Sequence, residues 1–259
     1  MRLRSSNPAL SDMVFDREAS LAGPTATTMT LGGTIVKTAA LVVILATVGG
    51  VSGYLTSRYL DRPPSDRPLW VAIFFVASML FALITAVVTS AKPRWSVVTA
   101  PLYAVFEGWA VGAISTFFDA EYAGIVLLAV AMTVGVLVAL LAAYVTRLIK
   151  PTQNLRLGIA AATGGLMLVY TTSLLLGLFG IKIPFIHDNT LLGIVFSLIA
   201  VTVAAFNLVL HFDFIENGVA RGAPKYMEWY AGFGLLVTLV WLYIEILNLL
   251  AKLRSRNKS

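Results

Sequence analysis

The sequence predicts an all-α integral membrane protein with seven transmembrane helices. Of its 259 residues, 58% are hydrophobic and 12% are charged, whereas soluble domains carry about 25% charged residues. Seven apolar runs, separated by polar segments, are each long enough for the roughly 20 residues that a spanning helix needs. The chain contains no cysteine, which excludes disulfides, thiolate catalysis and thiolate metal sites.

All seven predicted spans are bounded by charged, Pro-containing or Gly-containing segments, and they lie at residues 35–54, 69–90, 97–118, 122–144, 157–179, 191–215 and 227–250. The first span carries Gly49, Gly50 and Gly53, a small-residue face that allows close helix packing. The second follows a Pro-rich loop and contains no charged residue. The third follows the basic turn that ends at Trp95, an aromatic residue typical of a membrane interface.

The fourth span is the most uniformly apolar, and a basic loop separates it from the fifth. The fifth contains Gly164 and Gly165, which favour close packing in the same way. The sixth span begins after a short loop at residues 182–189. The seventh begins after a turn that contains Gly222 and Pro224, two residues that interrupt helices.

The spans divide the chain into three regions. Residues 1–34 are polar and broken by Pro and Gly, so they predict a mostly disordered cytosolic tail. Residues 35–251 form the seven-helix transmembrane domain. Residues 252–259 form a basic C-terminal tail.

The distribution of Lys and Arg predicts a cytoplasmic N-terminus in the cell inner membrane. With seven spans, eleven of the 19 basic residues fall on the side of the N-terminus. The other side holds the remaining eight, four of them in the C-terminal tail. Short cytoplasmic loops carry an excess of Lys and Arg, and the first helices usually set the orientation. The net charge of +6 is therefore attributed to basic residues in cytoplasmic loops. No nucleic-acid partner is predicted.

Two carboxylates lie where an apolar span should carry none. Asp213 is near the end of the sixth span, and Glu245 is deep inside the seventh. A charge at that depth costs roughly 2.5–3.5 kcal/mol on insertion scales, so such an acid usually faces the interior and has a partner. In the simplest arrangement the two acids face each other and share a proton. In the alternative arrangement, the two acids are separate, and each lies at a water interface or is bonded to a backbone group.

The depth of the two acids argues against their pairing. Antiparallel helices place residues at matching depths, at about 1.5 Å of rise per residue. Asp213 lies close to the end of its helix, whereas Glu245 follows Trp229 by some sixteen residues. The pair can meet only if the sixth helix continues through Glu216, residues 218–229 form an extended connector and the seventh helix begins late.

Glu107 and His211 each have a functional and a structural interpretation. Glu107 lies inside the third span, where it either lines a cation path or bonds Tyr, Ser or Thr on a neighbouring helix. His211 is more often a packing or hydrogen-bonding residue than a metal ligand. A zinc hydrolase would need three protein ligands, but the chain has two histidines in all. A serine protease would need a base beside Ser173 or Ser197, and none is evident. The sequence predicts no enzyme.

The segment around Asp213 and the final run Leu242-Tyr243-Ile244-Glu245-Ile246-Leu247-Asn248-Leu249-Leu250 resemble the C-terminal signature of the Bax inhibitor-1 family, the transmembrane Bax-inhibitor-motif proteins. Ser5-Ser6-Asn7-Pro8 and Phe106-Glu107-Gly108 look like the bacterial branch of that family. The resemblance covers nearly the whole chain from the first span. It implies seven helices, six of them packed around the C-terminal seventh.

The resemblance also implies an ion leak, chiefly of calcium, that is gated by pH through two buried acids. Carried over, these acids are Asp213 and Glu245, and Glu245 departs from the Asp that family members commonly have. The pH-sensing relatives hold a basic residue near the start of the third helix, for which Arg94, and less well Lys92, is the candidate. Calcium prefers several oxygen ligands, which Asp213, Glu245, Asn248 and backbone carbonyls would supply. No bound cofactor is predicted.

Two function hypotheses follow. In the first, the protein is a pH-sensitive cation leak channel or exchanger, with calcium as the transported ion. In the second, it is a membrane interaction protein that modulates a membrane protease or a stress response, and its acids brace the fold. Its partners are the lipid bilayer and cations in the first case, and also a membrane protein in the second.

Overall fold

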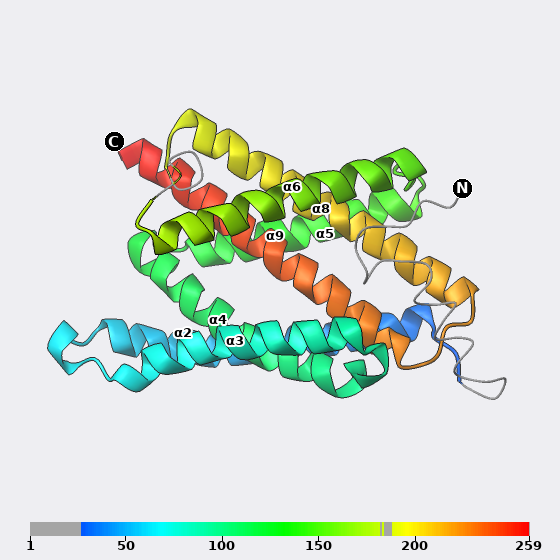
Figure 1. Cartoon of the computed structure of the whole chain (residues 1–259), viewed down its shortest axis with the longest axis horizontal. Coiled ribbons are helices and arrows are strands. Elements are labelled where there is room, and N and C mark those ends of the chain that lie inside the picture. Colours follow the sequence, from blue (N-terminus) through cyan, green and yellow to red (C-terminus); the bar gives the residue numbers. More distant parts are fainter. Residues whose placement is uncertain (1–26, 182, 184–187, 259) are drawn as a thin grey trace. The chain divides into compact units, whose positions relative to one another are not determined.

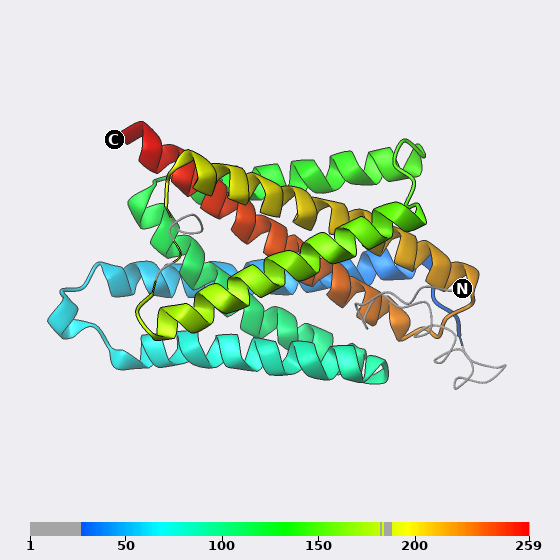
Figure 2. The ribbon, with the colours of Figure 1, turned by 45° about the horizontal axis from the view of Figure 1, so that its top comes forward.

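The computed structural model describes residues 27–181, 183 and 188–258, and most of these residues form long helices (Figure 1; Figure 2 shows them from a second direction). The helices are α2 (Leu31–Leu60), α3 (Leu69–Ala91), α4 (Ser96–Glu121), α5 (Ile125–Val145), α6 (Gln153–Leu178), α8 (Leu191–Ala220) and α9 (Met227–Lys258). Two short 3₁₀ turns, η2 (Pro64–Asp66) and η3 (Pro93–Trp95), precede α3 and α4. All seven helices are long and apolar enough to cross a membrane, which confirms the predicted fold class.

Several helices extend beyond the predicted apolar runs. The first begins at Leu31, because the Thr30 side chain caps it by accepting a hydrogen bond from the Gly33 N–H. The sixth continues to Ala220, and Gly222, with a φ of 65°, then turns the chain. The seventh continues to Lys258, so residues 252–258 are helical and not a separate tail. The predicted disordered segment falls largely on residues 1–26, which lie outside the described residues.

The chain folds as two compact units that share α8 and α9. One unit contains α5, α6, α8 as far as Asp213 and α9 from Thr238 onward. The other contains α2, α3, α4, the end of α8 and the start of α9. We refer to them as the α5–α6 unit and the α2–α4 unit.

In the α2–α4 unit, α4 packs against both α2 and α3. The contact with α2 is close because glycines face each other, as the small-residue face of the first span predicts. A Cβ atom on Gly112 would overlap the backbone of Gly49, and a Cβ on Gly108 would lie 2.6 Å from the Leu45 carbonyl oxygen. A Cβ on Gly50 would meet nothing within 4 Å, so Gly50 is not part of this contact.

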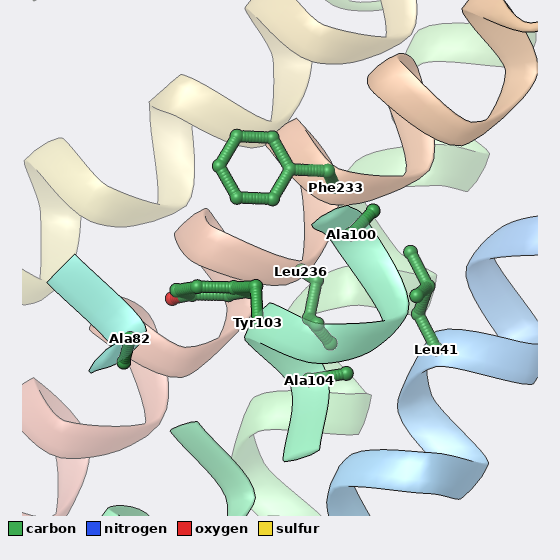
Figure 3. Packing of buried hydrophobic residues seen from close by; sticks show 7 residues of the cluster. All are labelled: Leu41, Ala82, Ala100, Tyr103, Ala104, Phe233 and Leu236. Carbon is green, nitrogen blue, oxygen red and sulfur yellow. The ribbon is translucent and has the colours of Figure 1, made fainter. Parts of the chain in front are cut away.

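The core of the α2–α4 unit joins α9 to the three other helices (Figure 3). Its buried members are Leu41, Ala82, Ala100, Tyr103, Ala104, Phe233 and Leu236. The rings of Tyr103 and Phe233 pack edge to face, with centroids 5.1 Å apart. This packing gives α9 a fixed position among α2, α3 and α4 within the unit.

The exposed side chains identify the environment of the helices. Leu69, Leu127 and Leu168 have more than 70% of their surface exposed, and other large apolar side chains are exposed along α2, α3, α5 and α6. In contrast, 72% of the most apolar window of α9 is buried, against 50% or less in each of the other six helices. Large exposed apolar surfaces suit lipid and not water, so the protein is a multi-pass membrane protein whose last helix is the most enclosed.

Candidate functional site

Asp213 forms an ion pair with Arg156 in the α5–α6 unit. Nη2 of Arg156 lies 2.6 Å from Oδ2 of Asp213, a short charge-assisted contact. Arg156 is on the first turn of α6, which begins after the capping residue Thr152. The Asp213 side chain is 17% exposed and that of Arg156 41%, so the protein encloses the pair only in part.

Glu245 lies on α9 with 4% of its surface exposed. The Tyr170 hydroxyl, from α6, donates a hydrogen bond of 2.7 Å to Oε1 of Glu245. The Trp241 indole N–H, one turn earlier on α9, donates a second one of 3.0 Å to the same oxygen. The indole N–H can only donate, so Oε1 acts as an acceptor. Glu245 is therefore anchored by one contact between helices and one within its own helix.

Lys252 completes the polar surroundings of Glu245. It is two turns further along α9, close enough to attract Glu245 electrostatically. Its Nζ donates to the Gly193 carbonyl oxygen at 3.0 Å and to the Ser197 hydroxyl at 2.8 Å, both on α8. The predicted tail residue thus points into the α5–α6 unit and joins α9 to α8.

The structure does not bring Asp213 and Glu245 into contact, and the predicted shared-proton pair is corrected here. Among the described residues, the hydrogen-bond partners of Glu245 are Tyr170 and Trp241. Asp213 instead contacts Arg156. Arg156 and Tyr170 are fourteen residues apart on α6, which is about 21 Å along a helix axis. The two acids therefore occupy separate sites at different depths.

The short connection between α8 and α9 explains this separation. The sixth helix continues past Glu216, as pairing would need, but α9 begins at Met227 and not later. Asp213 is then seven residues from the end of α8 and Glu245 eighteen residues from the start of α9, about 10 Å and 27 Å along the two axes. Pairing of Asp213 with Glu245 would require an extended connector and a later start of α9. The structure has neither.

Three further predicted site residues lie on α8, α9 and η3. His211, 8% exposed, has Nε2 2.7 Å from the Thr238 hydroxyl, which supports its hydrogen-bonding interpretation. Asn248 lies on α9 three residues after Glu245 and is partly buried. Arg94 is exposed on η3 in the α2–α4 unit. The basic residue that contacts Asp213 is Arg156, not Arg94.

Glu107 differs from Asp213 and Glu245 because the structure assigns no hydrogen bond to its carboxylate among the described residues. It is partly buried in the middle of α4. Tyr103, one turn earlier, is near enough to interact with it electrostatically. The structural interpretation required a bonded Tyr, Ser or Thr, and no such bond is assigned to Glu107 among the described residues.

The sequence did not predict Arg156 and Tyr170, two residues that contact the predicted acids. Arg156 was assigned to a basic loop, although Pro151 and Thr152 mark the start of a helix just before it. Tyr170 precedes the polar cluster at Thr171–Ser173 but carries no signal of its own.

The chemistry of the side chains does not support a metal centre in the described part of the chain. No three His, Cys, Asp or Glu residues gather there. Because Asp213 and Glu245 are apart, they do not form the calcium ligand set that the resemblance implies.

Comparison with known proteins assigns the family. A search of curated proteins finds no match to the chain. The model of the family described as Bax inhibitor 1 like matches residues 7–255, which is nearly the whole chain and covers six helices in full and α9 as far as Ser255. This multi-pass membrane protein therefore belongs to the Bax inhibitor 1 like family.

Proposed function

We propose that this protein is a pH-sensitive pathway for cations across the inner membrane, either a leak channel or an exchanger, with calcium as the expected ion. The observation that carries the proposal is Glu107, a carboxylate inside α4 whose surroundings among the described residues provide no hydrogen bond. A charge-bearing group at that depth is costly. A group that only braced the fold would have a bonded partner, whereas a group that lines a path binds ions from it.

The pH sensitivity is attributed to two separate contacts in the α5–α6 unit. Protonation of Asp213 removes its charge and so the attraction to Arg156, which fastens α8 to the start of α6. Protonation of Glu245 weakens the hydrogen bonds that Tyr170 and Trp241 donate to it. Each contact favours one packing of the helices when the acid is ionised, so a fall in pH shifts the population towards a second packing.

The second hypothesis, an interaction protein that modulates a membrane protease or a stress response, is also supported by one observation. Glu245 accepts hydrogen bonds from Tyr170 and Trp241. An acid with a purely structural role would be bonded in this way. In both cases the N-terminus is assigned to the cytoplasm by the Lys and Arg distribution, and no enzymatic step is assigned.

Reconstitution in liposomes that contain a calcium-sensitive dye distinguishes the two hypotheses. The pathway hypothesis predicts a calcium flux that changes with pH. It also predicts that Asp213→Asn, which resembles the protonated acid, gives at pH 7 the flux that the unchanged protein shows at low pH. Asp61→Asn, in the exposed turn after α2, is the matched control and should keep the pH profile. Flux that is absent at every pH would favour the interaction hypothesis.

A further inference from the structure

A polar cluster of the α2–α4 unit lies at the start of α9, outside the sites described above. Glu228 is 0% exposed there. Its Oε1 accepts hydrogen bonds from the backbone N–H and the hydroxyl of Thr30, each of 3.0 Å. Lys225 adds an ion pair of 2.7 Å to the same oxygen. A single carboxylate oxygen thus joins the residue that caps α2 to the turn that precedes α9.

Backbone pairing continues this contact towards the end of α8. Thr28 forms an antiparallel bridge with Pro224. The Met29 N–H donates to the Ala223 carbonyl oxygen at 2.6 Å, and the Lys225 N–H donates to the Thr27 carbonyl oxygen at 2.8 Å. Met29 and Ala223 are buried. We call the paired segments 27–30 and 223–228 the clasp.

The charge of Glu228 suits its position. The carboxylate lies at the N-terminus of α2, where the free backbone N–H groups and the helix dipole favour an anion. It lies so close to Gly33 that a Cβ atom on that residue would overlap it. Gly33 is therefore required as glycine by the carboxylate that packs against its Cα.

The closed clasp contains one unfavourable feature, a buried oxygen atom of Glu228 without a hydrogen bond. Oε2 of Glu228 is buried and has no hydrogen-bond partner among the described residues. A buried carboxylate oxygen without a partner is destabilised relative to water, so opening the clasp returns hydration to Oε2 while it breaks the contacts of Oε1. This opposition lowers the free-energy difference between the closed and the open arrangement, as expected of an element that opens locally.

We propose that the clasp is a conformational device in which Glu228 is the positioning residue, and that its closure by residues 27–30 fixes the connector between α8 and α9. The clasp thereby joins the segment before α2 to the connector between α8 and α9 within the α2–α4 unit. This inference concerns the fold and goes beyond the proposed ion pathway.

Two adjacent glycines provide a matched test. Gly33→Ala introduces a Cβ that must displace the Glu228 carboxylate, whereas Gly32→Ala introduces one that meets nothing within 4 Å. Both substitutions are in the first turn of α2 and favour the helix equally. The chain has no cysteine of its own, so a single Ala223→Cys substitution reports on the clasp, with Ala220→Cys at an exposed position as the reference.

The full-length protein in detergent is treated with a water-soluble maleimide. We expect the Ala223→Cys thiol to react at least about tenfold more slowly than the Ala220→Cys thiol, because local opening must precede reaction. Gly33→Ala should raise the rate at Ala223→Cys about tenfold, while Gly32→Ala leaves it within about twofold. Equal rates in the two glycine variants, or equal rates at the two cysteine positions, would overturn the proposal.

Hydrogen exchange gives a second measurement on chains without the added cysteine. The Met29 and Lys225 amides, which donate across the clasp, should exchange faster in Gly33→Ala and in Thr30→Val than in Gly32→Ala. Unchanged protection in both of the first two variants would contradict the clasp. Neither readout needs ion flux, so the clasp and the proposed pathway fail or succeed separately.

Discussion

Glu107 and Glu245 are both carboxylates within apolar helices, but their surroundings differ. Glu245 accepts hydrogen bonds from Tyr170 and Trp241, whereas none is assigned to the Glu107 carboxylate among the described residues. Because an unpaired charge in a membrane helix is costly, the partners of each acid indicate its role. Glu245 is part of the helix packing, and Glu107 is the better candidate for direct contact with an ion.

The Tyr170–Glu245 hydrogen bond should contribute measurably to stability. Tyr170→Phe removes the hydroxyl that donates to the carboxylate, and bonds to charged groups contribute about 1.5–3 kcal/mol. We expect a fall of that size in the free energy of unfolding, measured by denaturation in detergent. Tyr54→Phe, at a residue that is 64% exposed, should change little. Equal effects of the two substitutions would show that the hydroxyl of Tyr170 does not stabilise the fold.

The Arg156–Asp213 ion pair should show a coupling that depends on pH. A double-mutant cycle with Arg156→Gln and Asp213→Asn isolates the interaction from other effects of each substitution. Since the Arg156 side chain is 41% exposed, solvent screening limits the expected coupling at neutral pH to about 0.5–1 kcal/mol. The coupling should be present while Asp213 is ionised and disappear at a pH low enough to protonate it. A coupling that stays constant down to pH 2 would mean that the pair is not electrostatic.

Asp213 and Glu245 could be predicted from the sequence, because a charged residue in an apolar run is visible without a structure. It did not identify Arg156 and Tyr170, because their pairing depends on the relative depth and rotation of α6, α8 and α9. A resemblance to other proteins suggested that the two acids meet. The six-residue connection between Ala220 and Met227 instead sets their depths, and this is a property of the fold.

At the scale of helices, hydropathy located all seven spans but not their ends. The apolar run of the sixth span ends near Ile215, yet α8 continues to Ala220. A helix ends where its hydrogen bonds are capped or its backbone turns, here at Gly222, and not where it leaves the lipid. The clasp was not predicted for a related reason: segments 27–30 and 223–228 are polar and short, and only their mutual pairing gives them structure.

The close contact between α2 and α4 should be sensitive to single methyl groups. Gly112→Ala places a Cβ on the backbone of Gly49, whereas Gly135→Ala, in the middle of α5, meets nothing within 4 Å. We expect Gly112→Ala to lower the free energy of unfolding by about 1–3 kcal/mol, as overpacking does. Gly135→Ala should be neutral or stabilising, by up to about 1 kcal/mol. If both variants were equally stable, the helices would not approach as closely as the glycines indicate.

For the molecule as a whole, the composition and the seven apolar runs sufficed to predict a seven-helix membrane protein, and the family match over residues 7–255 agrees with it. The division into two units that share α8 and α9 has no signal in the sequence, since it arises from contacts between distant segments. The sidedness of the molecule still rests on the Lys and Arg distribution.

A topology reporter tests that sidedness. A reporter enzyme that is active only in the periplasm, fused after Asn154 at the start of α6, should be silent because the α5–α6 turn is expected in the cytoplasm. A fusion after Asp66, in the turn between α2 and α3, should be active. The opposite pattern would invert the orientation of the whole molecule.

The most direct test of the proposed pathway is the calcium flux through the protein that carries the Glu107→Gln substitution. The variant removes the charge and keeps the shape of the side chain, and Glu121→Gln, at the exposed end of the same helix, is the matched control. In dye-loaded liposomes we expect Glu107→Gln to lower the flux at least about tenfold while its unfolding free energy stays within about 1 kcal/mol of the unchanged protein, as for a polar residue without bonded partners. Glu121→Gln should retain both flux and stability. A Glu107→Gln protein that conducts as well as the unchanged one, or that loses its fold, would contradict the assignment of Glu107 to the ion path.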